Sequence, residues 1–329
     1  MTTRRHFSGA ALSATASLYL GLAAKVGAQE KFPSKPIRIV YPAAPGVGVE
    51  SLIRLIGSKM SEQFGQPVLL ENRPGANAQI GIAHVAKSAP DGYTLGVGYV
   101  TNLALAPHIY KTLPYDPLKD ITPIGLIAEN YLALVVQPNA PITSANDISK
   151  WAKAKPNGLS LGLTSVGGLP HLAFEQLAHK VDIKPFTVVS YNGNSQLLQD
   201  LIGGRLDIAM VDYSGAQPFI DAGTIKLVGI TYPTRDSRLP KLPTLAESVK
   251  GYESVGWFGL VCAARTPEPI VESLNQALVA ALAQPDVQKS MQFFGLLPAP
   301  GSSKYFATRL KSENDKYAEL AKQIGFKPL

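Results

Sequence analysis

The spacing of hydrophobic residues predicts alternating strands and helices along most of the chain. Segment 37–41 is a β-branched run after a proline, which is typical of a strand, and segment 50–64 has the apolar repeat of an amphipathic helix. The same criteria predict further strands at 67–70, 94–97, 159–163, 187–189, 208–211 and 227–230, and further helices at 79–87, 146–154, 172–179, 195–202, 218–222, 267–283, 285–294 and 303–324.

This alternation predicts an α/β protein in which helices cover both faces of parallel sheets. Two longer extended segments, 124–136 and 253–263, are predicted to cross between two lobes, because 329 residues exceed the usual size of one domain. We therefore expect two Rossmann-like lobes with a two-strand hinge. Residues 29–128 with 254–329 would form the first lobe and 129–253 the second, with a ligand bound between them.

The first 28 residues have the pattern of an export signal. Arg4 and Arg5 precede a weakly apolar segment, and Val26, Gly27 and Ala28 supply the small residues of a cleavage site. The adjacent arginines indicate a twin-arginine signal, with a general secretory signal as the alternative. The sequence therefore predicts a periplasmic protein that is cleaved after Ala28.

The export signal changes what the charge of the chain implies. The full chain has a formal net charge of +7, but Arg4, Arg5 and Lys25 lie in the signal, which holds no acid, so the remainder carries +4. No run of four lysines or arginines occurs, and no basic stripe carries interleaved aromatic residues, which argues against a nucleic-acid partner. Glu129 and Asn130 interrupt the apolar run 121–138, so it does not predict a membrane span.

Cysteine and histidine counts exclude several kinds of site. Cys262 is the one cysteine, which excludes a disulfide framework and a zinc ribbon, and its apolar surroundings predict that it is buried. The histidines outside the signal include no pair at i,i+4 spacing: His84, His108, His171 and His179. We therefore expect neither a metal nor a cofactor.

Two glycine loops precede predicted helices and have the character of anion sites. In the first, 42–49, the loop meets a helix N-terminus, where free N–H groups and the helix dipole favour an anion. A dinucleotide fingerprint fails because Ser51 stands where its third glycine would be, whereas a purely structural glycine turn remains an alternative. The second loop, 164–170, combines Ser and Thr hydroxyls with glycine amides in a second nest.

A serine hydrolase is not supported at the second loop. Leu163 replaces the first glycine that a nucleophile elbow around Ser165 requires, and Asp212 does the same for Ser214. His171 has no acid partner at a fixed offset. It is interpreted either as a packing histidine at the helix start or as a ligand contact.

The whole chain after the signal resembles the Bug family, the solute-binding proteins of tripartite tricarboxylate transporters. The resemblance begins with 33–46 and is most distinctive at Glu71-Asn72-Arg73-Pro74-Gly75-Ala76. It continues, in chain order, through 80–81, 89–95, 113–117, 171–173, 203–207, 239–244 and 246–247.

The resemblance implies a type II periplasmic binding protein that closes two lobes on a small carboxylate. It implies a monomer that delivers this ligand to membrane permease subunits, or alternatively to a sensor kinase. An exported enzyme on the same fold is a further alternative, against which the absence of an acid–base or metal constellation argues. No catalytic activity and no cofactor are expected.

The resemblance also implies where the carboxylate binds, mainly through backbone amides and hydroxyls. The first carboxylate loop corresponds to Ala43, Ala44, Gly46, Val47 and Gly48, and the facing loop to Thr164, Ser165, Val166, Gly167 and Gly168. Further candidate contacts are Thr101, Asn102, His171, Asp212 and Tyr213.

The first loop departs from the family pattern P-G-G-x-x-D at two positions. Val47 replaces the second glycine and Glu50 replaces the aspartate at the helix start. These changes make the loop bulkier and more apolar. We therefore expect a less polar or aromatic carboxylate rather than citrate.

Overall fold

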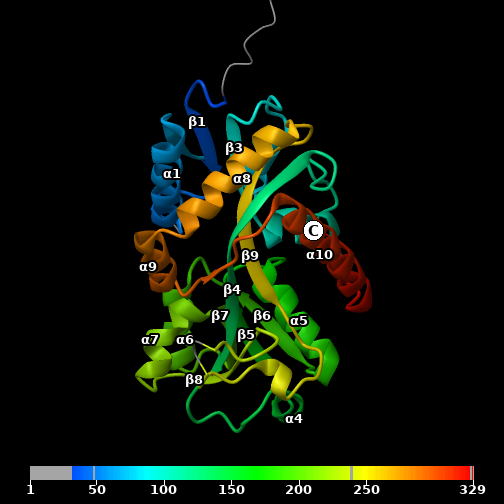
Figure 1. The fold of residues 1–329 in the computed structure, drawn as a ribbon. Coiled ribbons are helices and arrows are strands. Elements are labelled where there is room, and N and C mark those ends of the chain that lie inside the picture. The colour runs from blue at the N-terminus through cyan, green and yellow to red at the C-terminus, as the bar shows by residue number, and fades with distance from the viewer. Residues whose placement is uncertain (1–31, 47–48, 238–239, 327, 329) are drawn as a thin grey trace, which may run out of the picture.

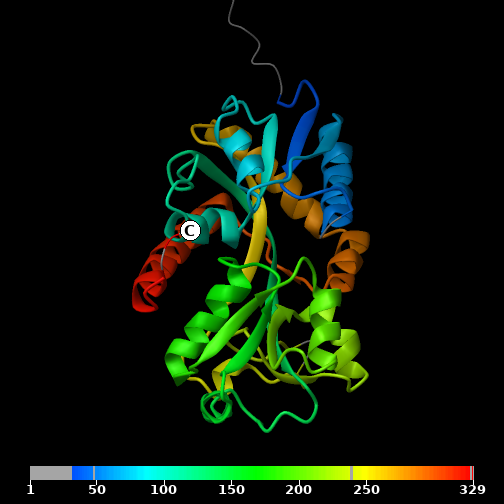
Figure 2. The same cartoon turned by 180° about the vertical axis from the view of Figure 1, so that it is seen from behind.

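A computed structural model of the protein describes residues 32–46, 49–237, 240–326 and 328. It has two lobes stacked end to end, with long strands running between them (Figures 1 and 2). The expected export signal and its cleavage site lie outside the described residues. Within the described part of the chain, no helix is long and apolar enough to cross a membrane.

The elements follow the expected order. The first lobe contains β1 (Ile37–Tyr41), α1 (Glu50–Phe64), β2 (Val68–Asn72), α2 (Gln79–Ala86), β3 (Thr94–Tyr99), the π-helical turn η1 (Thr101–Leu105) and α3 (Ala106–Ile109). Strand β4 (Ile121–Val136) leads into the second lobe, which contains α4 (Asp147–Ala154), β5 (Leu159–Leu163), α5 (Leu169–Val181), β6 (Phe186–Ser190), α6 (Asn194–Ile202), β7 (Ile208–Asp212), α7 (Tyr213–Asp221), β8 (Lys226–Ile230) and the 3₁₀ turn η2 (Leu245–Glu247). Strand β9 (Val255–Ala263) returns to the first lobe, which ends with α8 (Glu268–Leu282), α9 (Pro285–Phe293), β10 (Leu297–Pro298) and α10 (Ser303–Gln323).

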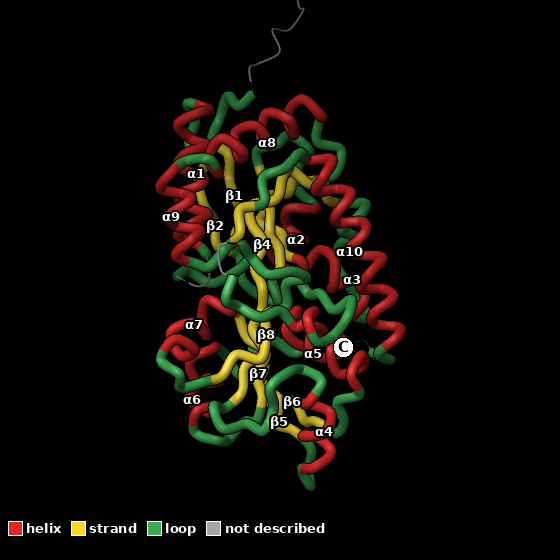
Figure 3. Tube along the Cα trace, turned by 60° about the horizontal axis from the view of Figure 1, so that its bottom comes forward, coloured by secondary structure: helices red, strands yellow, loops and turns green. Residues whose placement is uncertain are grey.

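One sheet extends through both lobes, in the strand order β2-β1-β3-β9-β4-β7-β5-β6. Strand β4 pairs with β9 from Ile121 to Tyr131 and with β7 from Leu132 to Val136, so it changes partner in the middle. Figure 3 shows the yellow strands continuing through the centre of the molecule with red helices on both sides. This change of partner lies close to the lobe boundary at 128/129 that the sequence predicts.

The expectation of wholly parallel sheets is wrong at the crossover strands. Strand β1 is parallel to β2 and β3, and β5 is parallel to β6 and β7. Strand β9 is antiparallel to β3 and β4, and β4 is antiparallel to β7 and β8. Because β4 leaves the first lobe and β9 returns to it, two adjacent crossover strands run in opposite directions.

Two helical regions differ from the sequence-based expectation. Helix α7 begins at Tyr213, directly after β7, whereas the apolar spacing predicts a helix over 218–222. Turn η1 and helix α3 are not predicted at all, because Leu103, Ala104 and Leu105 form a continuous apolar run without a helical period. Both regions follow strand ends at the level where the lobes meet, so both bear on the site.

The core of the first lobe forms under α1. Leu52, Ile53, Ile56 and Met60 are fully buried on one face of that helix, where they join an apolar cluster with the strands β1 and β9. Removing this much apolar surface from water is the main stabilising term, at roughly 25 cal/mol per Å². Cys262 is fully buried in the same cluster, as its apolar surroundings predict.

Candidate functional site

Two neighbouring compartments form a cleft where strands of both lobes end. The first compartment has a volume of about 350 Å³ and the second about 380 Å³, which is a size suited to a small molecule. Tyr99 at the end of β3, Asn130 on β4 and Asp212 at the end of β7 line both compartments. These three residues therefore mark the boundary between the compartments.

The two compartments differ in chemistry. Polar groups from both lobes line the first compartment, among them Asn77, Thr101, Asn102, Thr164 and Ser165. Aromatic side chains dominate the second compartment, among them Tyr41, Tyr131, Phe258 and Phe294. No described lysine or arginine lines either compartment. An anion in this cleft would therefore rely on neutral hydrogen-bond donors.

Two buried donors on residues that line the first compartment have no partner among the described residues. Among the described residues, Asn102 Nδ2 and Trp257 Nε1 are buried without a hydrogen bond, although both side chains belong to the lining. Asn102 Oδ1 accepts from the Tyr99 N–H at 2.8 Å, which orients the amide so that Nδ2 is the unused atom. Because buried donors in native proteins are nearly always paired, these two are candidate donors to an acceptor that a ligand supplies.

The first glycine loop contributes less to the cleft than the sequence predicts. Ala43 lines the first compartment, but Ala44 and Gly46 line neither. Gly46 has a left-handed φ of +76°, and its N–H donates to the Glu50 carboxylate. Glu50 Oε1 also accepts from Arg54 Nη2 at 2.6 Å. The helix start is thus already occupied by a carboxylate of the protein, and Val47 and Gly48 lie outside the described residues.

The environment of Glu50 keeps its carboxylate ionised. The Gly46 amide and then the Arg54 guanidinium lower the pKa of Glu50. A ligand carboxylate at the start of α1 would have to displace this internal anion. The structure therefore points away from Gly46 as a ligand donor and toward the rest of the first compartment.

The second loop presents its hydroxyl residues to the cleft. Thr164 and Ser165 line the first compartment, whereas Val166, Gly167 and Gly168 do not. Leu169 and Pro170, at the start of α5, also line it and are not predicted from the sequence. The prolines and leucines of helix starts are common packing residues, so nothing in the sequence distinguishes these two.

His171 supports the second loop from behind. Its Nδ1 accepts from the Gly167 N–H at 3.0 Å, and its ring contacts Phe326, beyond α10, at a centroid distance of 5.9 Å. The expectation that His171 lacks an acid partner is wrong, because Glu175 Oε1 lies 3.6 Å from Nε2, one helical turn later. His171 is buried and does not line either compartment.

The remaining predicted residues divide between the cleft and its surroundings. Thr101, Asn102 and Asp212 line the first compartment. Tyr213 is buried and packs on Tyr131 at a ring distance of 5.3 Å, outside both compartments. Burial raises the pKa of Asp212, and the hydrogen bond from Asn130 Nδ2 at 3.0 Å partly opposes this.

Asn130 and Trp257 are the important cleft residues that the sequence-based list lacks. The sequence could have identified Asn130, because this residue and Glu129 interrupt the apolar run of β4. No feature of the sequence identifies Trp257 as a cleft residue, because it lies in a continuous apolar strand between buried neighbours. Only the pairing of β9 with β4 brings Trp257 beside Glu129 at the level of the cleft.

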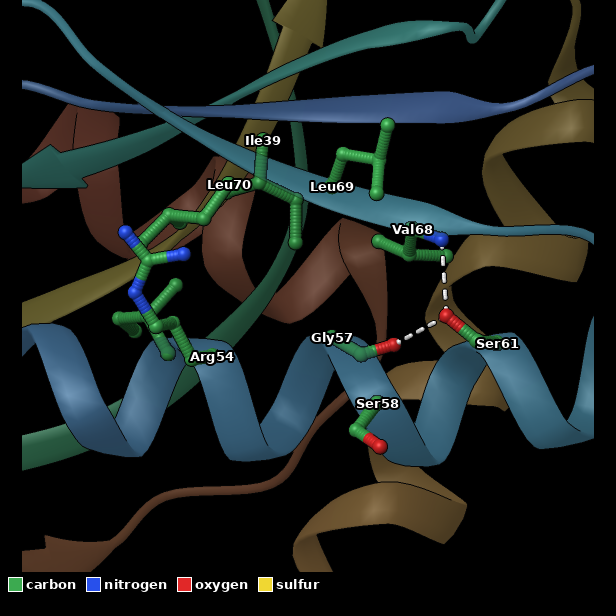
Figure 4. A pocket seen from close by; sticks show the side chains of 9 residues that line it. Ile39, Arg54, Gly57, Ser58, Ser61, Val68, Leu69 and Leu70 are labelled. Carbon is green, nitrogen blue, oxygen red and sulfur yellow. Dashed lines mark hydrogen bonds between the residues drawn. The ribbon is translucent and has the colours of Figure 1, made fainter.

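A separate cavity of about 250 Å³ lies between α1 and β2 on the first lobe (Figure 4). Ser61 Oγ donates to the Gly57 carbonyl at 2.9 Å and accepts from the Val68 N–H at 2.8 Å. No described side-chain nitrogen or oxygen in this cavity is both buried and unpartnered. The cavity therefore lacks the unused donors that mark the cleft. Within the described residues, no group of three His, Cys, Asp or Glu side chains could hold a metal ion.

Comparison with known proteins identifies the family of the chain. Residues 52–326 match the model of a family described as the tripartite tricarboxylate transporter family receptor. The chain belongs to this family. A UPF0065 protein of Pseudomonas sp. (strain P51) is 32% identical to this receptor over 96% of the chain and 93% of that protein. The BugT protein of Bordetella pertussis is 26% identical over 93% and 94%.

Solved structures of related proteins show the same two-lobed fold. An R. palustris protein determined with adipate is 32% identical, with a TM-score of 0.78 over 91% of this receptor and 100% of that chain. MatC of Rhodopseudomonas palustris, with bound malate, is 28% identical, with a TM-score of 0.74 over 88% and 99%. The periplasmic binding protein BugD is 27% identical, with a TM-score of 0.75 over 91% and 100%. The receptor therefore has the type II periplasmic binding protein fold that its sequence resemblance implies.

Proposed function

We propose that this receptor binds a small carboxylate in the cleft and delivers it to the membrane permease subunits of a tripartite tricarboxylate transporter. The observation that carries the proposal is the pair of unused donors, Asn102 Nδ2 and Trp257 Nε1, in a compartment lined by both lobes. The Thr164 and Ser165 hydroxyls add further donors from the second lobe. Relatives of the same fold hold adipate and malate, which are carboxylates.

Binding between the lobes explains how the ligand would be signalled to a partner. Asn102 lies in the first lobe, and Ser165 lies in the second. A ligand that contacts both lobes binds the closed form more tightly than the open form, so it shifts the population toward closure. The permease would then recognise the closed arrangement of the two lobes.

The finer points of the proposal follow from the sequence. The receptor is exported by a twin-arginine signal, cleaved after Ala28, and acts in the periplasm as a monomer. Its lobes are 29–128 with 254–329 and 129–253. The aromatic lining of the second compartment supports a less polar or aromatic carboxylate, because this half of the cleft offers Tyr41, Phe258 and Phe294.

A panel of carboxylates tests the function directly. Thermal unfolding of the purified receptor is measured with aromatic and aliphatic monocarboxylates, adipate, malate and citrate, each beside its uncharged carboxamide. We expect at least one carboxylate to stabilise the receptor by about 2.7 kcal/mol at 100 times its dissociation constant. The matching carboxamide should stabilise it less.

Mass spectrometry of small molecules released by denaturing the purified receptor widens this panel without bias. A released carboxylate that rebinds supports the function. Stabilisation by citrate alone would contradict the less polar ligand, and release of only uncharged compounds, with no response to any carboxylate, would contradict the receptor role itself.

A further inference from the structure

Asp212 occupies a position that a carboxylate-binding cleft would be expected to avoid. It is the last residue of β7, it lies opposite Leu132 of β4, and it lines both compartments. The structure gives its carboxyl group one hydrogen bond among the described residues, from Asn130 Nδ2 at 3.0 Å. A ligand that extends from one compartment into the other must pass this group.

Among the described residues that line the two compartments, none carries a positive charge that balances Asp212. No described lysine, arginine or histidine lines either compartment. Burial raises the pKa of Asp212, which records the cost of keeping this carboxylate ionised without a counter-charge. If the ligand carried a second carboxylate group, that group would be repelled by the like charge of Asp212. An ammonium group on the ligand would instead supply the missing positive charge.

The second compartment contains a further acceptor beside the same boundary. Asn194 Oδ1 is buried there without a partner among the described residues. Gly215 leaves the space for this side chain, since a Cβ at Gly215 would lie 2.7 Å from Asn194 Nδ2. The first compartment thus holds unused donors, and the boundary and the second compartment hold acceptors, Asp212 and Asn194 Oδ1.

We infer that the ligand is an amino carboxylate with an apolar or aromatic side chain, and that Asp212 selects its ammonium group. The inference rests on the proposed carboxylate-binding function and specifies its ligand class. The carboxylate binds the donors of the first compartment, namely Asn102 Nδ2 and Trp257 Nε1. The ammonium donates to Asp212 at the boundary, and the side chain packs among Tyr41, Phe258 and Phe294.

The experiment compares amino acids with their amine-free counterparts by calorimetric titration. The pairs are L-phenylalanine with 3-phenylpropionate and L-leucine with 4-methylpentanoate, and phenylsuccinate serves as an aromatic dicarboxylate. For the native receptor we expect at least one amino acid to bind tenfold or more tightly than its amine-free counterpart, as a charge-assisted hydrogen bond at a buried site allows. We expect phenylsuccinate to bind more weakly than 3-phenylpropionate.

The variant Asp212→Asn keeps the size of the side chain and removes its charge. It should abolish the tenfold preference of the amino acid over its amine-free counterpart. Asp221→Asn is the matched control, because Asp221 ends α7, is exposed and lines neither compartment. This control should bind every ligand as the native receptor does.

The outcomes separate the inference from the function on which it rests. If amine-free carboxylates bind as tightly as the amino acids, or if both aspartate variants lower amino-acid binding equally, the role of Asp212 is overturned and the carboxylate function stands. If neither amino acids nor any carboxylate of either panel binds the native receptor, both are overturned. A co-purified ligand with a carboxylate and no amine would also overturn the role of Asp212.

Discussion

Trp257 illustrates how a single atom can carry functional information inside an otherwise apolar core. The residue is 1% exposed, and its ring packs edge-on against Phe306 at a centroid distance of 5.4 Å, as a core tryptophan does. Its Nε1 donor, however, has no partner among the described residues. Since an unpaired buried donor costs about 1–3 kcal/mol, the N–H is better explained by an acceptor that the ligand supplies than by packing alone.

Trp257→Phe should therefore weaken ligand binding more than it disturbs the fold. Loss of a hydrogen bond to a charged group corresponds to about 1.5–3 kcal/mol, so the dissociation constant of the tightest carboxylate should rise about tenfold or more. Titration calorimetry measures this change. The other tryptophan, Trp151, lies on α4 away from the cleft, and Trp151→Phe is the control. Equal affinity for the two variants would show that Nε1 does not contact the ligand.

The sequence suggests that the glycines of the second loop supply backbone amides to an anion. In the structure, glycine is required at these positions for backbone conformation and for space. Gly167 has a φ of +77°, which favours glycine. Gly168 has an ordinary φ, but a Cβ there would lie 2.3 Å from Ser165 Oγ. The second glycine therefore makes room for the hydroxyl of Ser165, which lines the cleft.

At the scale of elements, the start of α1 shows how one substitution changes a loop. The sequence predicts an anion site there from the glycines and the helix dipole, and the structure places an anion there, the carboxylate of Glu50. A glutamate can reach back to Gly46 because its side chain is one carbon longer than that of aspartate. The sequence indicates that an anion is favourable at this helix start, whereas which carboxylate is found there depends on where the Glu50 side chain folds.

Helix α4 begins with another internal carboxylate, and this one makes stability depend on pH. Asp147 Oδ2 accepts from the Thr143 N–H at 2.8 Å and from the Ser144 N–H at 2.9 Å. These backbone hydrogen bonds lower the pKa of Asp147 to about 2. Because the ordinary value is 3.8, the stabilisation is complete above that value and is lost as the pH falls toward 2.

Asp147→Ala should lower the free energy of unfolding at pH 7 by about 1 kcal/mol, the net value of a typical hydrogen bond. Urea unfolding at pH 7 and at pH 2–3 measures the difference from the native receptor, which should shrink on acidification. Asp315→Ala is the control, because its ion pair with Lys311 is largely exposed and should contribute about 0.5 kcal/mol or less. A difference that stays the same at low pH would contradict the role of the Asp147 carboxylate.

At the scale of the molecule, Glu129 connects the two lobes through the crossover strand β4. Its carboxylate accepts from Arg309 Nη1 of α10, and its Oε2 accepts from the Tyr232 hydroxyl at 2.9 Å. Tyr232 follows β8 in the second lobe, whereas α10 covers the first. Burial and the Glu129 carboxylate raise the pKa of Tyr232 to about 12, so its hydroxyl remains a donor at physiological pH.

Glu129→Gln should destabilise the receptor, because it leaves the Arg309 charge largely buried without its counter-ion. Both side chains are 15% exposed, and breaking such a pair costs about 3 kcal/mol. Urea unfolding measures the loss. Glu253→Gln is the control, since Glu253 forms a more exposed ion pair with Lys316, which lies on α10 as Arg309 does. This variant should lower the free energy of unfolding by about 1 kcal/mol or less. Similar losses of unfolding free energy in the two variants would show that the contacts of Glu129 stabilise the receptor no more than the exposed ion pair does.

Much of this molecule follows from local sequence patterns. The alternation of β-branched runs and apolar helical repeats predicts the element order, and the two long extended segments predict β4 and β9. Glycine loops after strands predict anion sites, and the family resemblance implies ligand contacts at Ala43, Thr164 and Ser165 within them; these three residues line the first compartment of the candidate cleft. These features are predictable because each depends on residues that are neighbours in the chain.

Tertiary structure alone decided the features that depend on distant segments. The antiparallel direction of β4 and β9 results from one strand leaving a lobe and the other returning to it. Asn130 donates a hydrogen bond to Asp212 across 82 positions of the chain, and no neighbour among the described residues supplies an acceptor to the Trp257 donor. Hydrophobic spacing specifies which residues are buried, but which polar atoms find partners depends on which distant segments meet, and the proposed site rests on two atoms that find none among the described residues.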